Sequence, residues 1–76
     1  MELPMYFIVG RRPVKLIKPE AGGMDVLAYN WETGEFEREM DYLTTVLMGE
    51  GDVDRVSEQE FSQLVVQLQS ENQNGV

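Results

Sequence analysis

Neither cysteine nor histidine occurs among the 76 residues of this chain. A domain of this size must therefore fold without disulfides and without the thiolate and imidazole ligands of a structural zinc site. A single hydrophobic core then supplies only roughly 3 to 5 kcal/mol of stability. Hydrophobic residues make up 42% of the chain, as in ordinary globular domains. We expect one small folded domain over residues 1–69, followed by a disordered polar tail over residues 70–76.

The same absence restricts the chemistry. Without histidine no side chain titrates near neutrality at its ordinary pKa, and without cysteine there is no thiolate nucleophile. Ser57 has no companion base, and no glycine-rich stretch has the strand, helix and lysine context of a phosphate-binding loop. We therefore expect a protein that is not an enzyme and that binds no cofactor.

The first half of the chain predicts two β-hairpins. Residues 5–9 and 14–18 are rich in aromatic and β-branched residues and flank a turn-rich break of four residues. Residues 24–31 would place apolar side chains on both faces of a strand, which is typical of a central strand. A turn then places Gly34 in a left-handed conformation, and residues 35–40 form the return strand.

The second half predicts two helices. Asp41 caps a short helix over residues 42–48, which Gly49 ends. Ser57 and Glu60 then have the spacing of a capping box, so a second helix begins after Ser57. Its apolar residues recur on one helix face: Phe61, Leu64, Val65 and Leu68.

Together these elements predict an α+β fold. Two β-hairpins form a four-stranded antiparallel sheet, a short helix follows, and the C-terminal amphipathic helix packs on one sheet face. The alternative is a small open barrel in which residues 53–56 add a fifth strand. No segment approaches membrane-spanning length, and the apolar run at residues 5–9 is too short for a signal peptide. We expect a cytoplasmic protein that does not bind membranes.

Acidic residues outnumber basic ones by fourteen to six, for a formal net charge of −8. The charge is uneven, because residues 1–18 carry four cations and one acid whereas residues 19–76 carry thirteen acids and two arginines. Such a field repels phosphate, so we expect no direct binding of nucleic acid and instead expect a basic protein partner. The alternative is that the charge serves only solubility.

The acids include a regular row in residues 35–40. Strict alternation there places three glutamates on one side of the strand and Phe36, Arg38 and Met40 on the other. Three like charges at this spacing repel one another, so either Lys15 and Lys18 pair with them across strands or an external cationic surface does.

Trp31 lies beside the hairpin turn, close to this row in sequence. An exposed tryptophan among acids is typical of a protein-binding hot spot. The alternative is that Trp31 packs against Phe36 or beneath the C-terminal helix. The candidate partner-binding residues are Trp31, Glu32, Glu35, Glu37, Glu39 and Asp41.

The acidic loop before the second helix is a candidate metal site. Glu50, Asp52 and Asp54 offer the oxygen ligands that Ca²⁺ prefers. Counted from Asp52, however, Val56 stands at the fifth position and Ser57 at the sixth, where a calcium loop needs a ligand and a glycine. We expect no metal site, and a divalent-cation-binding protein that uses residues 50–54 is the second hypothesis for the function.

The small size and acidic composition are similar to those of bacterial and phage inhibitor proteins, such as toxin-immunity proteins and nucleic-acid mimics. This resemblance is one of composition and implies docking on a nuclease or another nucleic-acid-binding protein. The leading hypothesis is a non-enzymatic acidic protein-binding module, inhibitor-like or immunity-like, that docks on a basic partner surface. A third hypothesis is a small housekeeping domain.

Overall fold

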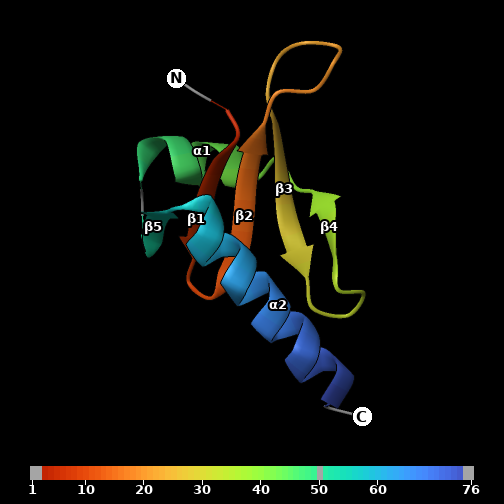
Figure 1. Ribbon diagram of the computed structural model, residues 1–76. Coiled ribbons are helices and arrows are strands. Elements are labelled where there is room, and N and C mark those ends of the chain that lie inside the picture. Colours follow the sequence, from red (N-terminus) through yellow and green to blue (C-terminus); the bar gives the residue numbers. More distant parts are fainter. Residues whose placement is uncertain (1–2, 50, 75–76) are drawn as a thin grey trace.

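The computed structural model describes residues 3–49 and 51–74 (Figure 1). Its strands form one antiparallel sheet in the order β4-β3-β2-β1-β5. The α+β class, the two hairpins and the interior position of β3 are therefore confirmed. In chain order the elements are β1 (Met5–Val9), β2 (Arg12–Ile17), β3 (Asp25–Asn30), β4 (Glu35–Arg38), α1 (Tyr42–Met48), β5 (Val53–Val56) and α2 (Glu58–Asn74).

Over the described residues the sheet has five strands, where the sequence predicted four. β5 is the strand that the barrel alternative anticipated, and it pairs with β1, so that Val53 opposes Val9 and Val56 opposes Tyr6. Acidic neighbours lower the strand propensity of this segment, and its partner strand lies more than forty residues earlier in the chain. The sheet is open rather than closed into a barrel, because β4 and β5 lie at its two ends.

The loop between β1 and β2 is shorter than predicted. Arg12 already belongs to β2 and pairs with Val9, so the loop is Gly10 and Arg11 alone, with Gly10 at a φ of 64°. Alternation along β2 then places Arg12 on the same sheet face as Val14. The second hairpin turns as predicted: Gly34 has a φ of 75°, and its N–H donates to the Asn30 carbonyl at 2.8 Å.

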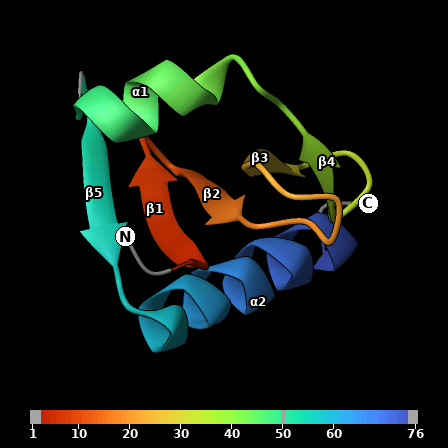
Figure 2. The ribbon, with the colours of Figure 1, turned by 90° about the horizontal axis from the view of Figure 1, so that it is seen from above.

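The two helices lie on opposite faces of the sheet (Figure 2). We call these the α1 face and the α2 face. On the α2 face, the Phe61 ring lies 4.8 Å from that of Tyr6 and 5.6 Å from that of Phe36, and Tyr29 is fully buried. The C-terminal helix therefore packs on one sheet face, as predicted. The α1 face carries the main core cluster: Phe7, Val14, Leu16, Val26, Ala28 and Val46.

α1 has the predicted bounds but not the predicted N-cap. Asp41 makes no capping hydrogen bond, because its backbone is already helical, with φ −60° and ψ −24°. The N–H groups of Tyr42 and Leu43 instead donate to backbone carbonyls three residues earlier, at 3.2 and 3.0 Å. Gly49 ends the helix in a left-handed conformation, as expected.

α2 begins with the predicted capping box. The Glu60 N–H donates to Ser57 Oγ at 3.1 Å, and the Ser57 N–H donates to the Glu60 carboxylate at 3.3 Å. The helix then continues to Asn74, so the tail predicted from residue 70 is helical up to that point. Its glutamine and glutamate residues favour helix, and no glycine or proline interrupts them before residue 75. No helix within the described ranges is long and apolar enough to span a bilayer.

Candidate functional site

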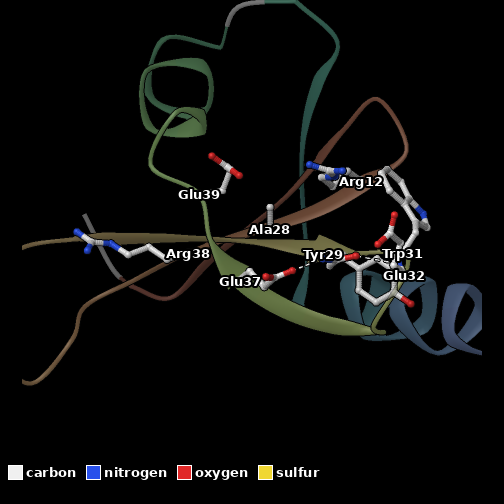
Figure 3. Close-up of a pocket in the computed structure, with 9 residues that line it drawn as sticks. Arg12, Ala28, Tyr29, Trp31, Glu32, Glu37, Arg38 and Glu39 are labelled. Atoms are coloured by element: carbon white, nitrogen blue, oxygen red, sulfur yellow. Dashed lines mark hydrogen bonds between the residues drawn. The ribbon is translucent and has the colours of Figure 1, made fainter.

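An open cavity of about 510 Å³ lies on the α1 face, at the β3–β4 end of the sheet. The small side chain of Ala28 forms its floor, and larger polar side chains stand around it (Figure 3). The Arg38 side chain points away from Ala28 (Figure 3) and pairs with Asp25, Nε to Oδ1, at 3.1 Å. The lining residues are Arg12, Ala28, Tyr29, Asn30, Trp31, Glu32, Glu37, Arg38 and Glu39.

The three alternating glutamates lie on the side of the sheet where this cavity opens. Glu37 pairs with Ala28 in the β3–β4 ladder, and Glu35 pairs with Asn30. The N–H of Glu39 donates to the Val26 carbonyl at 2.8 Å, which extends the same alternation beyond β4. We call Glu35, Glu37 and Glu39 the acidic row.

Neither lysine pairs with the acidic row. Lys15 lies on the other sheet face, where its Nζ is 4.7 Å from the centroid of the Phe36 ring. Its strand is also separated from β4 by β3. Lys18 is exposed beyond the end of β2. Within the described part of the chain, the pair between Arg38 and Asp25 is the one salt bridge, so no ion pair offsets the repulsion within the row.

Arg12 is a cavity residue that sequence reasoning missed. Its guanidinium carbon lies 4.5 Å from the centroid of the Trp31 ring, and its Nη1 donates to the Tyr42 hydroxyl at 3.1 Å. Its Nε is buried and has no hydrogen-bond partner among the described atoms. The predicted four-residue break left Arg12 outside the strands. Had a two-residue loop between β1 and β2 been recognised, strand alternation would have placed Arg12 on the α1 face.

Trp31 adopts neither of the two predicted arrangements in full. Its side chain is 41% exposed, and its ring meets the buried Tyr29 ring edge-on at a centroid distance of 6.3 Å. On another side it borders a hollow that Leu68 and Glu71 of α2 also line. Part of the indole is thus packed, and part remains accessible.

Asn30 holds the turn and the cavity wall together. Its side-chain N–H donates to the Glu37 carboxylate, and its Oδ1 accepts the Glu32 N–H at 2.8 Å. The second oxygen of Glu37 remains available to another donor. Of the candidate partner-binding residues, the structure gathers Trp31, Glu32, Glu37 and Glu39 around the cavity, whereas Glu35 and Asp41 are exposed outside its lining.

The residues of the metal hypothesis lie elsewhere. Asp52 precedes β5 and Asp54 belongs to it, at the opposite edge of the sheet from β4, while Glu50 falls outside the described residues. Within residues 3–49 and 51–74, no group of three or more acidic side chains is placed to hold a metal ion. No observation of the structure therefore favours the calcium hypothesis.

The cavity combines an apolar floor, an aromatic edge and carboxylates that form no ion pair with any described residue. A cationic side chain from another molecule matches these features, because its methylene stem packs on apolar surface while its charged head meets the acids. The guanidinium of Arg12 faces Trp31 and Tyr42, and it forms no ion pair with a carboxylate of the described residues. Comparison of the chain with protein-family models, with curated proteins and with solved structures finds no match.

Proposed function

We propose that this chain is a non-enzymatic protein-binding module whose acidic α1 face docks on a basic protein surface. One observation carries the proposal: the acidic row shares a sheet face, and the cations expected to pair with it lie elsewhere. Like charges at this spacing destabilise a strand. A partner that brings cations to them removes this repulsion.

The surroundings of the row support the same function. Trp31 is partly exposed and lines the cavity together with Glu32 and Glu37, and tryptophan is enriched among the residues that dominate binding energies. The net charge of −8 speeds association with a basic partner by electrostatic steering. A nuclease or another nucleic-acid-binding protein has such a surface because it binds phosphate, so an inhibitor-like role fits this chemistry.

A pair of triple variants tests the proposal. In the first, the three glutamates of the acidic row become glutamine. In the control, three exposed acids outside the row and away from Trp31 become the corresponding amides: Glu20, Asp52 and Glu58. Both variants lose the same formal charge, so a difference between them reports the effect of the position of the row rather than of the net charge. The immobilised wild-type chain first captures its partner from a lysate, and the rate of association is then measured with the purified partner at several salt concentrations.

We expect the row variant to associate about tenfold more slowly and to lose much of the salt dependence. The control should keep most of the association rate and most of its salt dependence, because the charges that lie at an interface dominate its electrostatic complementarity. Equal effects of the two variants would mean that the row acts only through its share of the net charge and not through its position. Unchanged association in the row variant would contradict docking through this face.

A further inference from the structure

β4 is a free edge of the sheet. Within the described part of the chain it pairs with β3 alone, and it carries the acidic row on one of its two sides. An edge strand presents backbone N–H and C=O groups that can pair with another extended segment. The edge and the acidic row therefore occupy the same short stretch of chain.

The ladder determines which backbone groups remain free. The Glu39 N–H donates to Val26, and antiparallel pairs alternate between bonded and non-bonded residues. Glu37, opposite Ala28, therefore faces β3 with its backbone groups, whereas Phe36 and Arg38 direct theirs outward. A strand added to β4 would hydrogen-bond to Phe36 and Arg38.

The charges on β4 repeat every second residue, which is the repeat of an extended chain. An added strand would place alternate side chains opposite Glu35 and Glu37 on the α1 face. Cations at those positions are favourable cross-strand partners. A helix presents side chains of one face at three- or four-residue spacing and does not match this repeat.

Two other pairings fit less well. β5 is also an edge, but each of its faces carries one charged residue, Arg55 on one and Asp54 on the other, so it offers no acidic repeat. A second copy of this chain that paired through β4 would bring the glutamates of both strands together, and such like-charge contacts are unfavourable.

We infer that the partner contributes an extended segment with a lysine or arginine at every second residue, which adds to β4 as a sixth strand. This inference rests on the proposed function and specifies how the basic partner is recognised. Its backbone would pair with Phe36 and Arg38, and its cations would lie along the acidic row. The main-chain bonds give affinity, and the alternating charges set the register.

Two synthetic peptides of equal charge test the inference. One is a hexapeptide with blocked termini that alternates lysine with valine, and the other places three lysines before three valines. Binding is measured by amide chemical shifts of the isotope-labelled chain, and amide hydrogen exchange is followed in the complex. We expect the alternating peptide to bind about fivefold tighter than the block peptide. It should slow the exchange of the Phe36 and Arg38 amides in particular.

A matched pair of variants tests the backbone contact. Arg38→Pro removes one outward N–H, and proline is tolerated on an edge strand at such a position. Arg38→Ala keeps that N–H and loses the same ion pair with Asp25. The proline variant should lose the preference for the alternating peptide, and the alanine variant should keep it. Should the proline variant fold poorly, an alternating peptide with N-methyl groups on the residues that face β4 gives the same comparison on the wild-type chain.

The outcomes separate the inference from the proposed function. The two peptides could bind with equal affinity, lose that affinity in the row variant and leave the Phe36 and Arg38 amides unprotected. In that case electrostatic docking stands and strand addition fails. Protection of β5 amides instead of those two also overturns the inference. If neither peptide binds at low salt, or if the row variant binds them as well as the wild type does, the docking hypothesis fails too.

Discussion

Arg12 connects three parts of the molecule through a single side chain. It belongs to β2, lies against Trp31 of the second hairpin turn and donates to Tyr42 at the start of α1. A guanidinium over an indole ring and a hydrogen bond from a charged donor each stabilise a contact by about 1 kcal/mol or more. Arg12 therefore sets the position of Trp31 at the edge of the cavity.

Replacing Arg12 tests this role. Arg12→Ala should lower the free energy of unfolding by about 2 kcal/mol, because the contacts with Trp31 and Tyr42 are lost together. It should also shift the fluorescence emission of Trp31, the one tryptophan of the chain, since its surroundings become more aqueous. Urea unfolding followed by this fluorescence measures both effects.

Lys18→Ala is the control, because Lys18 is a cation that lies exposed beyond the end of β2. It should change the free energy of unfolding by less than about 0.5 kcal/mol. Similar losses in the two variants would mean that charge, rather than the contact with Trp31 and Tyr42, accounts for the effect.

At the scale of elements, α2 depends on a few aromatic contacts for its place on the sheet. Phe61 is 5% exposed and lies between Tyr6 of β1 and Phe36 of β4, so it joins strands that are not neighbours. Gln69 adds a second tie further along the helix, where its side-chain amide donates to the Gly34 carbonyl at 3.0 Å.

Removal of the Phe61 ring should therefore be costly. Phe61→Ala is expected to lower the free energy of unfolding by about 3 to 5 kcal/mol, which is comparable to the whole stability of a small domain. Val66→Ala on the same helix, where the side chain is 63% exposed, should cost under about 1 kcal/mol. Thermal melts followed by circular dichroism compare them. A Phe61→Ala protein that melts within a degree of the wild type would show that α2 does not pack as described.

β4 presents the opposite case, because its acidic row works against folding. The triple change to glutamine should raise the free energy of unfolding by about 0.5 to 1 kcal/mol, or leave it unchanged, since repulsion is relieved and the row forms no ion pair with any described residue. Chemical denaturation of the wild type and the variant measures this. A clear loss of stability would reveal ion pairing of the row in solution and would weaken the proposal of a docking surface.

At the scale of the whole molecule, the charge of −8 acts over a body of 38 × 27 × 22 Å. The Debye length is about 30 Å at 0.01 M salt and about 8 Å at 0.15 M. At low salt most pairs of acids therefore repel one another, whereas at higher salt only near neighbours do. Self-repulsion of this kind opposes the compact state.

Stability should consequently rise with salt. Between 0.01 and 0.15 M sodium chloride we expect the melting temperature to increase by about 5 °C, which corresponds to roughly 1 kcal/mol for a domain of this size. The row variant should show a smaller increase because it carries fewer negative charges. A melting temperature that falls with salt would indicate that attractive pairs outweigh repulsion in the folded chain.

Local patterns in the sequence were sufficient to predict most of the helices, strands and turns. The turn at Gly34, the end of α1 at Gly49 and the capping box at Ser57 and Glu60 were all predicted. Each depends on hydrogen bonds between residues a few positions apart, so the information lies within a short window of sequence. The alternation that separates the acidic row from Phe36 is local for the same reason.

Contacts between distant segments determined the rest. β5 is a strand because β1 is available to pair with it, and Lys15 misses the acidic row because β3 lies between their strands and its side chain faces α2. The cavity forms where Arg12, Ala28 and Glu37 meet from three strands. Strand order and the choice of sheet face depend on which surfaces bury one another, and the free energy of that burial belongs to the assembled chain rather than to any one segment.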